Sequence, residues 1–205
     1  MDALEAIHSR RSIGKHLPDV PPRELIEQLL AAAVEAPNHH ETEPWRFFVV
    51  TGKAREEMGA VMEEALRKRM AGEDSKKVDG LAVAELAKPM RSPVLIVVGV
   101  KHDVKEKPAL SPSNGGGERI MPVEDLEACA AAIENMVLAA HALGLAAQWR
   151  TGDGAFDPYV KAWFGLAPLD EIAGIVYVGY RDAARDPPHR GPREWRGKTE
   201  WWGWE

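Results

Sequence analysis

The sequence has little of several features that would assign it to a familiar class of proteins. It has a single cysteine, Cys129, so no disulfide can form within the chain, and this usage is typical of a reducing cytoplasm. Its longest apolar run, around residues 94–98, is far shorter than the roughly 20 residues of a membrane-spanning helix. Asp2 and Glu5 stand where a signal peptide would be basic and then apolar. We therefore expect a cytoplasmic protein without a signal peptide or a membrane span.

The chain also lacks an excess of basic residues. It has 26 lysines and arginines against 32 acidic residues, a net charge of −6. A surface dedicated to nucleic acid normally carries a basic imbalance, so we expect no nucleic-acid partner. This charge still allows a local basic pocket for a phosphate group.

Three ligand-binding motifs are absent or incomplete. No Gly-x-Gly-x-x-Gly fingerprint is present, which disfavours a Rossmann dinucleotide domain. Gly197-Lys198-Thr199 looks like the end of a P-loop, but Pro192 stands where that motif requires glycine. His39 and His40 are adjacent and cannot share one helical face, so we expect no metal site.

The 205 residues suffice for one sizeable core. Helices are predicted between Pro22 and Ala36, over 54–70, from Pro122 to Gly144 and over 158–164. Strands are predicted over 47–51, 94–100, 146–150 and 172–180. Residues 101–121 are expected to form a loop. Because helices and strands mix without regular alternation, the fold class is α+β, with a central mixed or antiparallel sheet flanked by helices. Residues 1–180 form the domain, and 181–205 a Trp-rich extension.

Arg10-Arg11-Ser12 is the first candidate binding segment. It offers two guanidinium groups and a hydroxyl within one turn, and guanidinium groups match phosphate oxygens well. A solvated helix end is the structural alternative. Cys129 lies in a mostly apolar helical stretch, so we interpret it as a packing residue rather than a nucleophile.

Three further segments complete a pattern along the chain. They are Ala36-Pro37-Asn38-His39 leading to Pro44-Trp45-Arg46-Phe47-Phe48, Trp149-Arg150-Thr151-Gly152, and Gly174-Ile175-Val176-Tyr177-Val178-Gly179. Taken singly, the first is compatible with a surface histidine and the second with a buried tryptophan beside a surface arginine. In this order and spacing, the four segments resemble the FMN-dependent nitroreductase family, and most closely its branch of small NAD(P)H nitroreductases.

The resemblance implies an intertwined homodimer that holds FMN at the subunit interface. In such a site Arg10, Arg11 and Ser12 bind the FMN phosphate and ribityl chain. The partner subunit would contribute Pro37, Asn38 and His39, while Trp149, Arg150 and Thr151 lie along the cofactor, and Glu35 is a further candidate site residue. Arg150 would place positive charge near the flavin or its phosphate. Glu35 departs from the basic group often found there, so it would point away or use its backbone.

The resemblance also implies a reaction. NAD(P)H would deliver a hydride to flavin N5 and leave, and a nitroaromatic, quinone or similar electron-poor acceptor would then take the electrons in a ping-pong scheme. NAD(P)H would contact Ala139, Ala140, His141, Ala142, Leu143 and Gly144, although packing explains this segment equally well. No catalytic side chain is assigned, because solvent can supply the protons. Two alternatives remain open: the same fold and FMN with specialised chemistry (flavin fragmentation or dehalogenation), or a non-redox flavin-binding protein.

The C-terminal extension contains four of the seven tryptophans, Trp195, Trp201, Trp202 and Trp204. So many indoles on a free terminus would expose a large apolar area. We therefore expect the extension to dock on the dimer close to a flavin, the alternative being a partly disordered end. The alanine-rich helix from Pro122 is expected to face its copy across the dimer axis.

Overall fold

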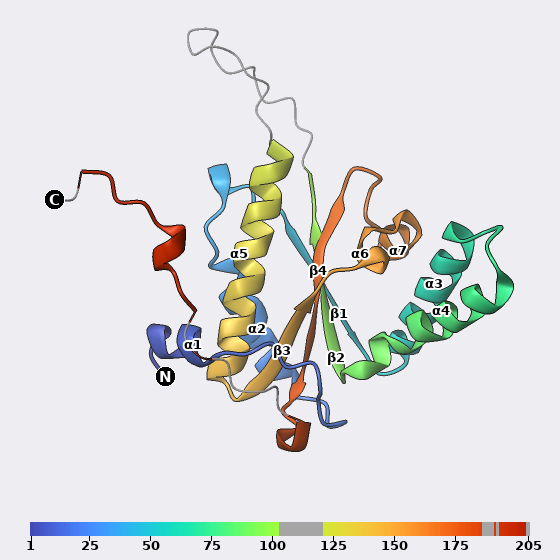
Figure 1. Cartoon of the computed structure of the whole chain (residues 1–205), viewed down its shortest axis with the longest axis horizontal. Helices are drawn as coiled ribbons and strands as arrows, with labels where there is room; N and C mark the ends of the chain where they lie inside the picture. Colours follow the sequence, from blue (N-terminus) through green and yellow to red (C-terminus); the bar gives the residue numbers. More distant parts are fainter. Residues whose placement is uncertain (103–120, 186–190, 192, 204–205) are drawn as a thin grey trace, which may run out of the picture.

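The computed structural model describes residues 1–102, 121–185, 191 and 193–203, and a four-stranded antiparallel sheet lies at its centre (Figure 1). In the order β1-β2-β4-β3, the strands are β1 (Trp45–Thr51), β2 (Val94–Val100), β4 (Glu171–Tyr180) and β3 (Leu145–Arg150). The continuous apolar runs form the two central strands, where both faces are covered. The predicted α+β class is confirmed, and of the two predicted sheet types, mixed or antiparallel, the sheet is antiparallel.

One face of the sheet is covered by α2 (Arg23–Val34) and α5 (Met121–Ala142), which pack against each other and against the strands (Figure 1). Their buried side chains form the larger core together with every second residue of β2 and β4 on this face of the sheet, such as Ile96 and Val176. The alanines of α5 serve this core in part: Ala128, Ala132 and Ala140 are buried within the chain. Small side chains there let the helix approach the sheet closely.

The opposite face carries α3 (Lys53–Arg69), α4 (Ser75–Ala87), α6 (Asp153–Phe156) and α7 (Pro158–Trp163). A second core, which includes Met58, Met62, Leu95 and Tyr177, fills the space between α3, α6, α7 and the sheet. Helix α4 was not among the predicted elements; it packs on α3, and the 3-10 helix Pro89–Arg91 links it to β2.

The N-terminal segment runs from α1 (Ala3–Ser9) along the β3 edge of the sheet. Ser12 forms an isolated parallel bridge with Ala147, and the Ile13 amide donates to the Ala147 carbonyl at 3.0 Å. Farther on, His16 bridges antiparallel to Arg181. These bonds fix the start of the chain beside β3 and place the residues that follow α1 next to α5.

The expected loop over 101–121 lies outside the described residues from 103 to 120, and α5 begins at Met121, one residue before the predicted start. Cys129 is fully buried, and burial raises the pKa of its thiol to about 12, which agrees with a packing role. In the described part of the chain, no helix is long and apolar enough to cross a bilayer.

The C-terminal extension contains the short 3-10 helices Ala183–Arg185 and Arg196–Lys198. Trp195, Trp201 and Trp202 are 49%, 60% and 85% exposed, so the described residues leave at least about half of each of these side chains open. The rings of Trp195 and Trp201 meet edge to face at 6.2 Å. Trp204 lies outside the described residues. Docking of this extension on a second subunit stays a prediction.

Candidate functional site

Arg10 caps the C-terminus of α1, and its side chain turns toward α5. The Arg10 amide donates to the Ala6 carbonyl, and the guanidinium Nε lies 3.6 Å from Glu134 Oε1. That Nε is buried without a hydrogen-bond partner in the described structure. Because a buried unsatisfied donor is costly, Arg10 offers a hydrogen bond to a ligand at this position.

The two neighbours of Arg10 are placed differently. The Arg11 guanidinium donates to the carbonyls of His8 and Arg10, each at 2.8 Å, and so braces the end of α1. Ser12 is exposed beside Ala147 of β3. The segment therefore presents one inward guanidinium and one accessible hydroxyl at the junction of α1, α5 and β3.

The candidate dinucleotide segment, residues 139–144, lies close to this junction. His141 Nε2 is 2.7 Å from the Ser9 hydroxyl. Burial lowers the pKa of His141, and the nearby charges of Arg10 and Arg11 lower it further, which favours the neutral imidazole. Ala140 is fully buried, whereas Leu143 and Gly144 are exposed in the turn after α5. Only part of the segment can therefore touch a ligand.

Asn38 and His39 lie at the other end of α5. The 3-10 helix His39–Glu41 contacts its first turn, with His39 Nε2 3.7 Å from Glu124 Oε1. The Asn38 side-chain oxygen accepts the Glu43 amide at 3.0 Å. Glu134 follows Glu124 by ten positions, so about 15 Å of α5 lies between the helix residues that these two segments contact. One chain does not bring the two predicted parts of the site together.

Glu35 and Pro37 lie at and just beyond the end of α2, whose Ala32 carbonyl accepts a hydrogen bond from Asn135 of α5 at 3.2 Å. Glu35 is the exposed C-cap of α2, and Pro37 is exposed in the turn that follows. In the described structure Glu35 forms no ion pair with Arg10, whose acidic neighbour is Glu134.

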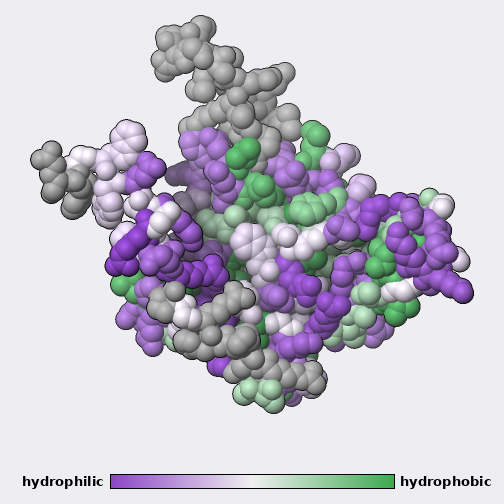
Figure 2. Space-filling view, viewed as in Figure 1, coloured by the Kyte–Doolittle hydropathy of each residue, from purple (hydrophilic) through white to green (hydrophobic). Residues whose placement is uncertain are grey.

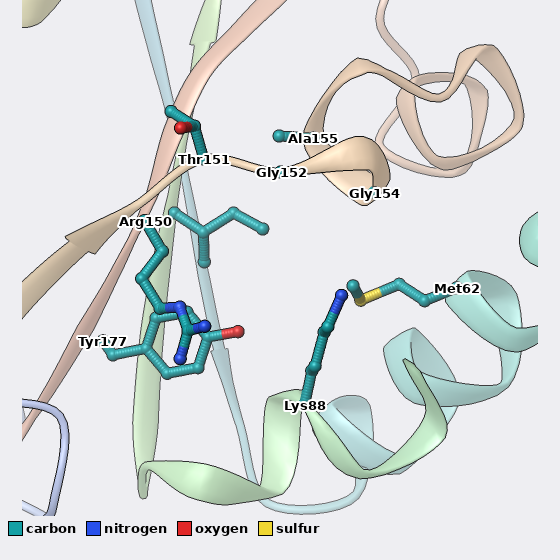
Figure 3. A pocket seen from close by; sticks show the side chains of 9 residues that line it. Met62, Lys88, Arg150, Thr151, Gly152, Gly154, Ala155 and Tyr177 are labelled. Carbon is teal, nitrogen blue, oxygen red and sulfur yellow. The ribbon is translucent and has the colours of Figure 1, made fainter. Parts of the chain in front are cut away.

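Trp149 and Arg150 leave β3 on opposite faces of the sheet, because successive strand residues alternate. Trp149 pairs with Val176 on the α5 face, is 38% exposed, and donates from Nε1 to the Ala173 carbonyl at 3.3 Å. The Arg150 guanidinium lies on the α3 face, 5.5 Å from the centre of the Tyr177 ring (Figure 3). The Arg150 side chain thus lies away from Trp149, and only its backbone continues into exposed Thr151.

Several groups near these segments were not predicted from the sequence. Lys88, Met62 and Tyr177 line a pocket with Arg150 on the α3 face, and the pattern of α4 gave no signal for Lys88. His102 lies between Asp125 and Glu171, at 3.3 and 3.7 Å. Among the described residues, no group of three or more His, Cys, Asp or Glu side chains could hold a metal ion.

Comparison with known proteins identifies the family of this chain. The profile described as "Nitroreductase family" matches residues 7–180. Two relatives are named "Putative NAD(P)H nitroreductase": YdjA of Escherichia coli K12 is 32% identical over 87% of this chain and 88% of its own length, and YfhC of Bacillus subtilis 168 is 29% identical over 92% and 89%.

Solved structures share the fold over nearly the whole chain. A nitroreductase-like family protein from Bacillus cereus has a TM-score of 0.79 and 23% identity, covering 99% of this chain and 97% of its own. A nitroreductase with bound FMN from Bacteroides fragilis has a TM-score of 0.72 and 24% identity, covering 98% of both chains. With the four motifs in place and the profile spanning the sheet and its helices, this chain belongs to the nitroreductase family.

Proposed function

We propose that the chain is an FMN-dependent oxidoreductase that transfers electrons from NAD(P)H to a nitroaromatic, quinone or similar electron-poor acceptor. Family membership supports this proposal, as do the printed names of YdjA and YfhC and the FMN bound to the Bacteroides fragilis structure. The single structural observation that carries it is the buried, unsatisfied Nε of Arg10 at the junction of α1, α5 and β3.

The residues at this junction fit a flavin phosphate. Arg10 supplies an unused charged donor, and Ser12 supplies an exposed hydroxyl at the adjacent edge of β3. The guanidinium charge near Glu134 is only partly offset, because the 3.6 Å separation exceeds a hydrogen bond. When bound, FMN supplies the chemistry of accepting a hydride and passing on electrons.

Trp149, Thr151 and the end of α5 would define the rest of the site. The indole of Trp149 is fixed by its bond to Ala173 and offers a partly exposed apolar surface on the α5 face. Such a surface can pack against a planar ring and exclude water from it. Neutral His141 would orient the Ser9 hydroxyl near the phosphate rather than add a further charge.

The separation of Asn38-His39 from Arg10 supports a composite site in a homodimer. Within one chain α5 holds these segments about 15 Å apart, so a second chain that supplies Asn38-His39 would bring them closer to the Arg10 site than its own chain does. Exposed apolar side chains also favour a partner: Leu4 and Ile7 of α1 are 69% and 53% exposed. Figure 2 shows one face of the molecule, on which apolar and polar side chains are mixed.

An absorption spectrum of the purified protein tests the proposal directly. We expect flavin bands that bleach when NADH or NADPH is added without oxygen, and that return when a nitroaromatic or quinone is added. A colourless protein that cannot be reconstituted with FMN would overturn cofactor binding. Flavin bands that neither nucleotide bleaches would overturn the oxidoreductase assignment and leave a flavin-binding protein or a different chemistry.

A further inference from the structure

The chain turns sharply between Asn38 and Pro44, just before β1. Glu41 and Glu43 adopt positive φ angles of 53° and 44°, and among the described residues other than glycine they alone do so. This left-handed region is sterically unfavourable for a residue that carries a side chain. Such a conformation persists only where surrounding contacts hold it, so the turn requires support from elsewhere in the fold.

Two hydrogen bonds within the turn link it to Asn38 and His39. The Asn38 side-chain oxygen accepts the Glu43 amide at 3.0 Å, and the His39 carbonyl accepts the Thr42 amide at 3.3 Å. A third bond leaves the turn, because the Thr42 hydroxyl donates to Asp125 Oδ1, near the start of α5, at 3.2 Å. Since Thr42 lies between the two strained residues, this bond fixes the turn at its strained point.

The carboxylate of Asp125 is shared between the turn and a histidine. Asp125 is only 5% exposed, so it depends on hydrogen bonds from the protein. Its second oxygen, Oδ2, lies 3.3 Å from His102 Nδ1. A carboxylate offers only acceptors, so the Thr42 hydroxyl and the His102 ring N–H both donate to it. Loss of either donor would leave a buried oxygen without that bond and free the side chain to turn.

His102 is in turn fixed to the end of the sheet. Its backbone amide donates to Asp170 Oδ1 at 3.2 Å, and its Nε2 lies 3.7 Å from Glu171 Oε2, at the start of β4. The His102 side chain is only 9% exposed. A continuous series of contacts therefore runs from the sheet through His102 and Asp125 to Thr42 and the strained turn.

We propose that Thr42, Asp125 and His102 act as positioning residues for the proposed reaction. They hold the Asn38-His39 segment in the conformation that contacts the flavin. The inference rests on the proposed function, in which this segment of one chain completes the flavin site of the other. Without the bond from Thr42, the turn relaxes toward ordinary backbone angles and moves the two residues to which it is bonded.

Two pairs of variants of the full chain test this role by FMN titration. Thr42→Val removes the hydroxyl with little change of shape, whereas Thr42→Ser retains it. His102→Leu removes the ring donor, whereas His102→Asn keeps an N–H close to the place of Nδ1. We expect Thr42→Val and His102→Leu to weaken FMN binding by about three- to tenfold, and the two conservative variants to stay within about twofold of the unaltered chain.

Hydrogen exchange without added FMN shows whether the effect acts through the turn. In Thr42→Val and His102→Leu, the amides of residues 39–43 should exchange several-fold faster, while Thr42→Ser should resemble the unaltered chain. Thr51→Val is the matched control, because it also removes a hydroxyl bond, to the Pro93 carbonyl at 3.0 Å, but at the other end of β1. It should leave both FMN affinity and exchange over 39–43 unchanged.

Equal FMN affinity of Thr42→Val and Thr42→Ser would overturn the inference and leave the proposed function intact. The same conclusion would follow if Thr51→Val weakened FMN binding as much as Thr42→Val, or if weaker binding came without faster exchange over 39–43. An unaltered chain that binds no FMN would overturn the proposed function, and this inference with it. If His102→Leu does not fold, the Thr42 pair still decides.

Discussion

The indole of Trp149 occupies the space that a side chain on Gly174 would need. A Cβ added to Gly174 would lie 2.0 Å from Trp149 Nε1 and 2.5 Å from its Cδ1. The indole therefore lies across the backbone of β4, where its Nε1 also reaches the Ala173 carbonyl. The absence of a side chain at Gly174 thus sets the position of the tryptophan that we place in the flavin site.

Gly174→Ala should displace Trp149 and lower the free energy of unfolding by about 1–3 kcal/mol, the usual cost of overpacking. The same change should weaken FMN binding if Trp149 packs on the flavin. Denaturant unfolding and an FMN titration measure the two effects. Gly80→Ala is the matched control: no atom lies within 4 Å of its added Cβ in helix α4, so it should stabilise by about 0.5–1 kcal/mol. Equal behaviour of the two variants would contradict the role of Gly174.

Arg10→Ala should weaken FMN binding by about ten- to a hundredfold, because it removes a charge-assisted contact worth about 1.5–3 kcal/mol. Flavin fluorescence during titration measures the affinity. Arg23→Ala is the control, since the Arg23 side chain is 86% exposed and, among the described residues, pairs with Glu27 one turn along α2. An Arg10 variant with the affinity of the unaltered chain would exclude Arg10 as a phosphate ligand.

Mixing inactive variants tests whether the flavin sites are composite. Arg10→Ala and His39→Ala protomers, combined in equal amounts, should regain activity up to about a quarter of that of the unaltered protein, because half of the dimers carry one intact site. The control mixes Arg10→Ala with Ser12→Ala. Those residues lie in one segment, so every mixed site keeps a defect and no recovery is expected. A monomer that binds FMN at micromolar concentration would contradict the composite site.

Deletion of residues 195–205 tests the docking of the C-terminal extension. If the exposed indoles pack on a second subunit, burying two of them removes a few hundred Å² of surface, worth several kcal/mol at ~25 cal/mol per Å² before entropy is subtracted. The deletion should lower the Tm and change the KM for NAD(P)H. Trp202→Ser, at the most exposed described indole, isolates one contact. Unchanged Tm, dimer stability and kinetics would show that the extension does not dock.

Acid should destabilise the fold through His16. Burial is the main cause that lowers the pKa of His16 below its usual 6.5, so below that pH the unfolded chain binds a proton more readily than the folded chain. The contribution of neutral His16 to the free energy of unfolding is therefore fully present above about pH 6.5. As the pH is lowered below that value, this contribution decreases by up to about 1.4 kcal/mol per pH unit until the pKa of the folded state is reached. Denaturant unfolding between pH 7.5 and 5 should show a flatter profile for His16→Gln than for His8→Gln. Identical profiles would refute this contribution.

Much of the fold could be predicted because its central elements are strongly patterned. The apolar runs of β2 and β4 and the periodic apolar positions of α5 each identify one element without tertiary information. Helix α4 was missed because its apolar residues are spread around the helix: Leu81, Val83 and Leu86 are exposed, while only Val78, Ala82 and Glu85 are buried. Its position depends on packing against α3, which sequence periodicity does not reveal.

The sequence indicated which segments belong to the candidate site, but not the distances between them or the directions of their side chains. Strand alternation already indicates that Trp149 and Arg150 face opposite sides, yet both were assigned to the flavin. The distance between His39 and Arg10 along α5 could be estimated only once the contacts of Glu124 and Glu134 were known. The pocket that Lys88 lines with Arg150 and Tyr177 could not be predicted from the sequence, because it forms only where the end of α4 packs beside β3 and β4.

The burial of Cys129 makes this chain convenient for thiol labelling. Its only thiol is fully buried with a pKa of about 12, so at neutral pH the reactive thiolate is scarce and shielded from reagents. A cysteine introduced in place of Trp202 would therefore accept a spin label or fluorophore with little background. Such a label could measure the distance between C-terminal extensions without first removing the native cysteine.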